Sequence, residues 1–349
     1  MSDLKEFVAK LEGPDETERT YAAEDIGYLN AADGVAPLLE RLDREPSRAV
    51  RDAIFQALTR IEADAALEGC IALLQNDDPQ IRNQAVDTLR RKGVAAIPFL
   101  RTVMREGDKD LRKLTLDVLS AIHTGDTDAI YEAALSDPDS NVVITAVENL
   151  GRSHAHQFKD RIEELLLTGS HPMLIGACLE ALAGIGNENS LKILRRRFQE
   201  LSIVPDFLLT SCLKALGALG TEADFAPVAA LLAVRGPQLR PAILAALIAI
   251  QQRHPGGSHD DDLLPLLRIA IDDLEAPLCC YQAVRALGFI SSRDDVYTFL
   301  LACLTSPERL VRLGAIECLR EAGRPESEDV LAARALTETD DDILHALRG

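Results

Sequence analysis

A large apolar residue, usually preceded by a small one, recurs eleven times along this chain, at intervals of 28 to 34 residues apart from a single interval of 40. The large residue is a leucine or isoleucine and is here called the anchor. The anchors are Ile26, Leu58, Leu89, Leu119, Leu150, Leu182, Leu216, Leu247, Leu287, Leu319 and Leu347. A period of this length is typical of an array of one repeated unit, so the repeat has to be recognised before any residue is considered for chemistry.

The residues around each anchor follow the pattern of an amphipathic helix. The positions three and four residues before the anchor are apolar or small, as at Phe55 and Ile54 before Leu58, and the position directly before it is usually Ala. Apolar positions at these spacings form one stripe of a 3.6-residue period, and small residues let a neighbouring helix approach closely. The pattern predicts one buried helix in every repeat.

A less regular helix is expected ahead of each anchor helix. The ranges expected in the first repeats are Asp3 to Leu11, Val35 to Leu42, Ala65 to Gln75, Ala95 to Arg105, Asp128 to Leu135 and Phe158 to Leu167. Turns with Pro, such as Asn76 to Pro79, separate the two helices, because Pro suits the first turn of the next helix. No segment alternates as a strand does. We therefore predict an all-α fold of about eleven helix pairs in one domain, residues 1–349, with a loop insertion at about 252–262.

The turn and the helix that follows it carry a short motif. A turn with Asp or Pro precedes V-R-x-x-A-x-x-A-L, as in Val50-Arg51 with Ala57-Leu58, and in Ile81-Arg82 with Ala85 and Leu89. This motif resembles the short HEAT-like repeats of phycobilisome lyases, over essentially the whole chain. The resemblance implies a right-handed α-solenoid whose second helices line a concave face. It does not specify a function, since this repeat serves many roles.

Charge and cysteine content narrow the classes of partner and compartment. The net charge is −19 and the pI is about 4.8, so the chain repels nucleic acid and anionic membranes and favours a partner protein or peptide with a basic or amphipathic face. The longest apolar runs reach about half of the ~20 residues that a membrane span needs. Seven cysteines without a C-x-x-C pair indicate a reducing compartment. We expect a soluble, cytoplasmic protein.

Arginine recurs seven positions before the anchor, and this arginine column consists of Arg19, Arg51, Arg82, Arg112, Arg240 and Arg312. We interpret it as structural, because the acidic turns of the same or the adjacent repeat supply carboxylates. Val143, Ile175, Leu209 and Cys280 interrupt the column. Apolar residues nearby, Ile144, Met173, Phe207 and Tyr281, predict an apolar groove for a partner's helix. Local repacking of unusually apolar repeats is the alternative.

The position two residues before the anchor is acidic in four consecutive repeats. These residues are Asp87, Asp117, Glu148 and Glu180. On second helices about 8 to 10 Å apart, they predict a negative ridge that steers a basic partner. The alternative is an ordinary solvated surface, since the chain carries 56 acidic residues.

Known motifs for catalysis, phosphate binding and metal binding are absent from the sequence. It contains no G-x-x-x-x-G-K-[ST], G-x-S-x-G or H-E-x-x-H, and no histidine spacing that matches a closed zinc site. The pair His154 and His156, and the pair His254 and His259, are interpreted as polar loop residues. We therefore expect neither a catalytic residue nor a metal, and no cofactor.

Two functions follow from these patterns. The first is a non-catalytic scaffold or adaptor that binds a protein on its curved inner face, because stacked helix pairs form an extended and rigid surface. The second, by analogy with phycobilin lyases, is an accessory protein for cofactor or chromophore attachment or for metal-cluster assembly. No residue can be matched to a bilin-handling position.

Overall fold

The computed structural model describes residues 2–122, 124–254, 263–272 and 276–348 of the chain. Within these ranges every regular element is a helix. The chain divides into two compact units, here called unit 1 (residues 1–153) and unit 2 (residues 154–349). Each is described by itself.

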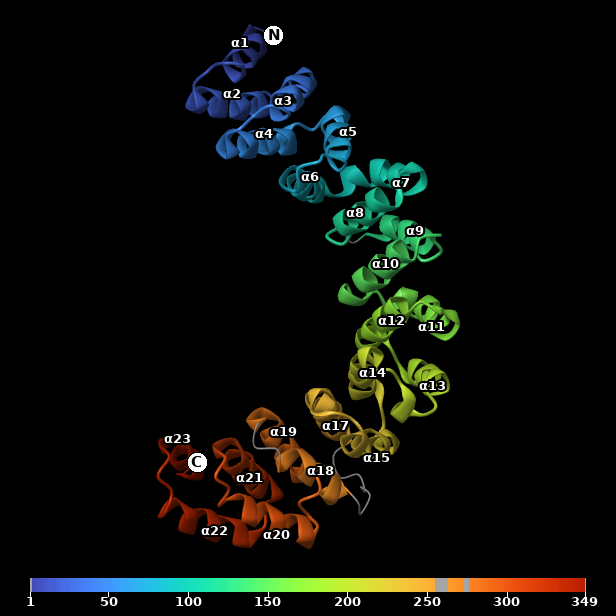
Figure 1. Cartoon of the computed structure of the whole chain (residues 1–349). Helices are drawn as coiled ribbons and strands as arrows, with labels where there is room; N and C mark the ends of the chain where they lie inside the picture. The colour runs from blue at the N-terminus through green and yellow to red at the C-terminus, as the bar shows by residue number, and fades with distance from the viewer. Residues whose placement is uncertain (1, 123, 255–262, 273–275, 349) are drawn as a thin grey trace. The chain divides into compact units, whose positions relative to one another are not determined.

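Unit 1 consists of five helix pairs. Its helices are α1 (Ser2–Leu11), α2 (Glu16–Leu29), η1 (Ala32–Gly34), α3 (Val35–Leu42), α4 (Arg48–Arg60), α5 (Asp64–Leu73), α6 (Pro79–Lys92), η2 (Gly93–Ala96), α7 (Ile97–Glu106), α8 (Lys109–Leu119), α9 (Gly125–Ala134) and α10 (Ser140–Arg152). The second helices, α2, α4, α6, α8 and α10, pack on one another in sequence and form one layer, while the first helices form the other (Figure 1).

Unit 2 consists of six pairs. Its helices are η3 (His156–Phe158), α11 (Lys159–Thr168), α12 (Pro172–Ile185), α13 (Glu188–Arg197), η4 (Leu201–Ile203), α14 (Asp206–Leu219), η5 (Glu222–Asp224), α15 (Phe225–Ala229), α16 (Leu231–Val234), η6 (Pro237–Leu239), α17 (Arg240–Arg253), α18 (Leu263–Ile271), α19 (Pro277–Gly288), α20 (Asp294–Cys303), α21 (Arg309–Ala322), α22 (Pro325–Ala335) and α23 (Asp341–Arg348). The short helices α15 and α16 together take the place of one first helix. The second helices α12, α14, α17, α19, α21 and α23 lie along the inner side of this unit (Figure 1).

Anchors and small residues explain why the second helices stack. Leu58, Leu89 and Leu119 are completely buried. Backbones meet where a glycine follows the anchor: a Cβ built on Gly27 would lie 2.7 Å from the Cα of Ala57 on the next second helix, which is closer than real Cβ atoms come. The small residues therefore set the distance between successive repeats, as their positions in the sequence indicated.

Side-chain caps and prolines fix where the second helices begin. The Asp78 carboxylate accepts a hydrogen bond from the Gln80 amide at 2.8 Å, and Pro79 follows at the first helical position. Asp108 caps α8 in the same way, through the amides of Asp110 and Leu111. These caps satisfy amides that have no partner inside the helix, so the acidic and Pro-containing turns of the sequence are true helix starts.

The all-α solenoid and its eleven helix pairs are confirmed in the described part of the chain. The expected helix Val35 to Leu42 matches α3, and the other expected first helices agree within a few residues. The single domain over residues 1–349 and the right-handed twist stay predictions. The predicted insertion at about 252–262 lies mostly outside the described residues, since α17 runs to Arg253 and residues 255–262 are not described. No helix in the described ranges is long and apolar enough to cross a membrane.

Candidate functional site

The arginine column joins successive repeats. Arg19 donates to both carboxylate oxygens of Glu45, at 2.9 and 3.1 Å, and Arg112 donates to both oxygens of Asp137, at 2.7 and 2.8 Å. Further links of this kind join Arg51 to Asp78 and Arg312 to Glu338. Each of these arginines also donates to backbone carbonyls in the turn of its own repeat. The structural interpretation of the arginine column is confirmed at these four positions, because the hydrogen bonds connect the turn of one repeat to the turn of the next.

The link between Arg19 and Glu45 is the most buried of the four. The Glu45 side chain has no exposed area, and the Arg19 side chain is 8% exposed. Burial has the largest influence on the pKa of Glu45 and raises it, but hydrogen bonds from Arg19, the Ser47 amide and Arg41 together hold that pKa below its ordinary value. The carboxylate is therefore ionised and paired in the folded protein.

The residues that interrupt the arginine column belong to the core. Val143, Ile175, Leu209 and Cys280 are between 0% and 6% exposed. They fill space between helices and contribute nothing to a binding surface. Their burial is consistent with the alternative of local repacking, which stays a prediction.

Two other arginines replace the links that are missing at Ile175 and Leu209 in unit 2. Arg197, at the end of α13, donates to the carbonyls of Leu167 and Gly169 at 3.1 and 2.8 Å. Arg235, after α16, donates to the carbonyls of Ser202 and Val204 and, through its other terminal nitrogen, to Asp206 at 2.7 Å. The two turns precede α12 and α14, whose own helices lack the column arginine. The loss of arginine at Ile175 and Leu209 is compensated from the following repeat.

Three of the exposed apolar side chains of unit 2 lie nine positions before the anchor, whereas Ile203, Val234 and Leu336 lie elsewhere. Met173 on α12 is 64% exposed, Phe207 on α14 is 63% exposed and Leu278 on α19 is 63% exposed. Helices α12 and α14 pack on each other, so Met173 and Phe207 occupy equivalent places on adjacent repeats. We call these three residues the apolar column. Exposed side chains of this size, repeated at one position of the repeat, are a feature of binding surfaces.

The other two residues of the predicted groove are placed differently. Tyr281 on α19 is half-buried, its hydroxyl donates to Glu317 at 2.7 Å, and burial raises the pKa of the hydroxyl to about 12. A Cβ built on Gly314 would lie 3.3 Å from the ring of Tyr281, so this tyrosine packs against α21. Ile144 is half-buried on α10 of unit 1. The groove as a whole stays a prediction.

The four predicted ridge carboxylates have different surroundings. Asp87 is exposed and lies 3.3 Å from Arg90, while Glu180 in unit 2 pairs with Lys214 of the next repeat. Glu148 is exposed. The fourth, Asp117, differs from these three and is described next. The negative ridge stays a prediction.

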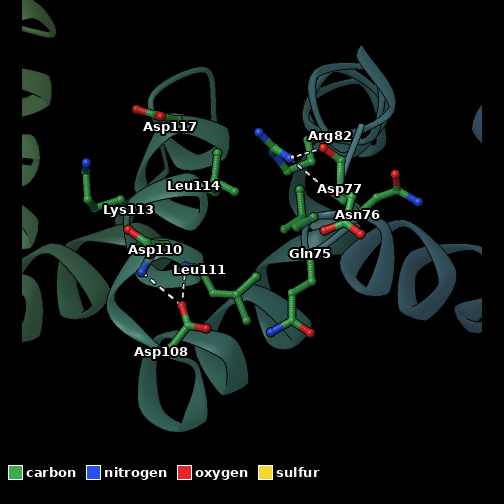
Figure 2. A pocket seen from close by; sticks show the side chains of 11 residues that line it. Gln75, Asn76, Asp77, Arg82, Asp108, Asp110, Leu111, Lys113, Leu114 and Asp117 are labelled. Atoms are coloured by element: carbon green, nitrogen blue, oxygen red, sulfur yellow. Dashed lines mark hydrogen bonds between the residues drawn. The ribbon is translucent and has the colours of Figure 1, made fainter. Parts of the chain in front are cut away.

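Asp117 on α8 is half-buried, and its carboxylate forms no hydrogen bond with the described residues. Burial raises its pKa above the ordinary value, and the positive charges of Arg90, Arg152 and Lys113 oppose this rise. It lines a cavity of about 610 Å³ between the turn before α6 and one side of α8 (Figure 2). Among the ridge carboxylates, Asp117 is the one that combines partial burial with an adjacent hollow.

Two exposed tyrosines were not singled out from the sequence. Tyr21 and Tyr28 on α2 are 62% and 69% exposed, and the guanidinium of Arg60 lies 4.4 Å from the centre of the Tyr28 ring. The signal was their spacing of seven residues, which places both side chains on one side of a helix. They add aromatic surface to the second helices of unit 1.

A family model for HEAT repeats matches residues 4–90 and 263–348. The chain contains HEAT repeats. The matched segments lie in unit 1 and in unit 2, so both units include this repeat. The finer assignment to the phycobilisome-lyase type is not part of this match.

Two solved structures share the solenoid fold of this chain. Kap121p is 14% identical, with a TM-score of 0.60 over 99% of this chain and 44% of its own. A chain from the structure in which Kap95p binds RanGDP is 15% identical, with a TM-score of 0.52 over 99% of this chain and 50% of its own. This chain therefore spans about half the length of either protein. No curated protein matches the chain.

The HEAT repeats bury their cysteines. All seven cysteines are free and buried, and burial raises the pKa of Cys70 and Cys178 to about 12. Thiols of this kind are poor nucleophiles, because the thiolate is the reactive form. Among the described residues there is no group of three or more His, Cys, Asp or Glu side chains placed to hold a metal ion.

Proposed function

We propose that this chain is a non-catalytic scaffold that binds a partner protein on the exposed side of its second helices. The observation that carries the proposal is the apolar column of Met173, Phe207 and Leu278, whose side chains are all more than 60% exposed. The fold does not use these side chains, because the anchors on the same helices already fill the core. A binding partner would remove them from water.

An amphipathic helix is the partner segment that this surface favours. The second helices expose no backbone edge, so a partner cannot add a strand, and recognition has to proceed through side chains. Phe207 and Met173 lie on packed neighbouring helices, whose axes are about 8 to 10 Å apart. Burying each of these side chains contributes roughly 1.5 to 3 kcal/mol.

The solved structures with the same fold support a protein partner. Kap95p binds the protein RanGDP, and this solenoid is similar to it in fold. The net charge of −19 favours a partner with basic residues beside its apolar face. We further propose a reducing, cytoplasmic compartment, since all seven cysteines are free and buried.

The double substitution of Met173→Ser and Phe207→Ser tests this function. We expect partner affinity to fall at least about tenfold, because two apolar contacts are lost. The melting temperature should stay within about 2 °C, because exposed side chains contribute little to folding. Partners retained from the native cell by the unmodified protein would be purified, and their affinity for both forms measured by calorimetry.

Leu336→Ser is the matched control, because Leu336 is 88% exposed at the end of the first helix α22, away from the apolar column. It should leave partner affinity unchanged. Unchanged affinity of the double variant together with a lowered melting temperature would show that Met173 and Phe207 are structural, and the proposal would be abandoned.

A further inference from the structure

The arginine column has a gap at Arg82, and the gap coincides with a cavity. Arg82 donates to the carbonyls of Asn76 and Asp77 in its own turn, but among the described residues it binds no carboxylate of the next repeat. The corresponding acid, Asp108, caps α8 through the amides of Asp110 and Leu111, as Asp78 caps α6, but unlike Asp78 it is not linked to the column arginine of the preceding repeat. No side-chain link closes the space between these two turns.

The cavity that results has an acidic rim and an apolar wall. Its volume is about 610 Å³. Leu111 and Leu114, both half-buried on α8, form the wall, and Asp110 and Asp117 lie on the same side of this helix, seven residues apart (Figure 2). Asp77 and Asp108 complete the rim. Four carboxylates and two cations, Arg82 and Lys113, line the cavity, so the charge of its lining is negative, although the charges of Arg90 and Arg152 reach Asp117 from outside the lining.

Asp117 is the group that the fold leaves without a partner. Carboxylates that are partly buried in proteins usually accept hydrogen bonds or pair with a cation, because removing them from water is otherwise costly. Arg90 reaches the backbone carbonyl of Asp117, at 2.9 Å from one terminal nitrogen, but donates to no oxygen of its carboxylate. Arg90, Arg152 and Lys113 act on this carboxylate through their charge, but among the described residues none donates a hydrogen bond to it, so its oxygens can still accept hydrogen bonds from a cation outside the chain.

We propose that this cavity binds an arginine side chain of a protein partner. The aliphatic stem would lie along Leu111 and Leu114, and the guanidinium would bind the carboxylate of Asp117, with Asp110 beside it. A planar guanidinium is suited to this place, because it donates two parallel hydrogen bonds to a carboxylate and is more weakly hydrated than an ammonium. The proposal rests on the scaffold function, and it assigns one contact of the partner to unit 1.

Labelled peptides test the proposal without knowledge of the natural partner. The probes are a Gly-Ser peptide with one arginine pair, the same peptide with citrulline, and the same peptide with lysine. Citrulline keeps the shape of arginine but carries no charge. Fluorescence anisotropy with the full chain should show binding of the arginine peptide, about tenfold weaker binding of the citrulline peptide and intermediate binding of the lysine peptide.

Asp117→Asn should lower the affinity for the arginine peptide about tenfold, because it removes the charge of the side chain and keeps its shape. Glu132→Gln is the control: it removes one negative charge from an exposed residue of the first helix α9 in the same unit, outside the cavity of about 610 Å³. It should change affinity less than twofold. Equal losses for Asp117→Asn and Glu132→Gln, or equal binding of arginine and citrulline, would overturn the proposal in favour of diffuse attraction. Free arginine binding as tightly as the peptide would overturn the assignment to a protein partner.

The outcome is separate from the test of the scaffold function. Met173 and Phe207 lie in unit 2, and neither lines the cavity. If Asp117→Asn keeps peptide affinity while Met173→Ser with Phe207→Ser loses its partner, the scaffold function stands and the arginine site is wrong. If the Asp117→Asn variant keeps its affinity for the arginine peptide and the Met173→Ser, Phe207→Ser double variant keeps its affinity for the partner, both proposals are wrong.

Discussion

The exposed sides of the second helices differ between unit 1 and unit 2, although both are built from the same repeat. The relevant positions lie two, five, six and nine residues before the anchor. In unit 1 they carry the six carboxylates Glu24, Asp52, Asp87, Asp110, Asp117 and Glu148 against one cation, Lys113. From α12 to α21 they carry only Glu180, Lys214, Arg285 and Glu317. The same backbone thus presents an acidic surface in unit 1 and a nearly neutral, more apolar one from α12 to α21, while the last repeat, which ends in α23, is acidic again, with Glu338, Asp341 and Asp342 at these positions.

The charges of unit 2 also cancel locally. Glu180 pairs with Lys214, and Arg285 lies 3.6 Å from Glu317. In unit 1, by contrast, Asp117 forms no ion pair among the described residues. A repeat array keeps its core positions constant, so recognition can change in the exposed positions without a change of fold. The following predictions test this division, from the largest expected effect to the smallest.

The first prediction concerns the links between repeats in unit 1. Glu45→Ala should lower the free energy of unfolding of this region by about 3 kcal/mol, because it leaves the buried charge of Arg19 without its partner. Hydrogen exchange of the amides in α2 and α4 measures the effect locally. Glu6→Ala is the control, since Glu6 is exposed and pairs only with the exposed Lys10. Equal protection in both variants would show that the link contributes nothing.

The second prediction concerns the compensating links of unit 2. Arg235→Ala should lower the free energy of unfolding by about 2 kcal/mol, because it removes the donor to several carbonyls in the turn before α14. Arg196→Ala is the control, since Arg196 is exposed in the neighbouring basic run of α13. Hydrogen exchange of the amides in α14 measures the effect. If these amides exchange at the same rate in both variants, Arg235 does not replace the arginine that is missing at position 209, and the two units differ more than we suggest.

The periodicity of the sequence predicted the fold well, because anchors, small residues and capped turns all have local signals. Leu58 and its equivalents are buried as expected, and Val35 to Leu42 is a helix with those bounds. The interpretation of the arginine column was also correct for Arg19, Arg51, Arg112 and Arg312, each of which binds an acid in the next turn. These features depend on neighbours within one repeat or on the equivalent positions of the next.

Other features depend on contacts of residues that do not belong to the repeated motif. Arg197 and Arg235 lie outside the repeated motif and reach back about 30 residues to bind carbonyls, so nothing in the motif marks them. Asp78 caps α6 and also binds Arg51, whereas Asp108 caps α8 and does not receive a hydrogen bond from Arg82. Residue type is the same at both positions, so the difference depends on side-chain geometry that the sequence does not show.

The smallest expected effect on stability belongs to Leu278, and it decides how far the apolar surface extends. The apolar column is interrupted by Gln238, which lies in η6 directly before α17, so Leu278 on α19 is either a third contact for the same partner or an isolated exposed residue. Leu278→Ser should change the free energy of unfolding by no more than about 0.5 kcal/mol, since the side chain is 63% exposed. If the partner spans both sides of Gln238, the substitution should still weaken partner binding several-fold, as measured by calorimetry beside the Met173 and Phe207 double variant. Unchanged partner affinity would confine the apolar binding surface to α12 and α14, and the contrast between the two units would then rest on two repeats of unit 2.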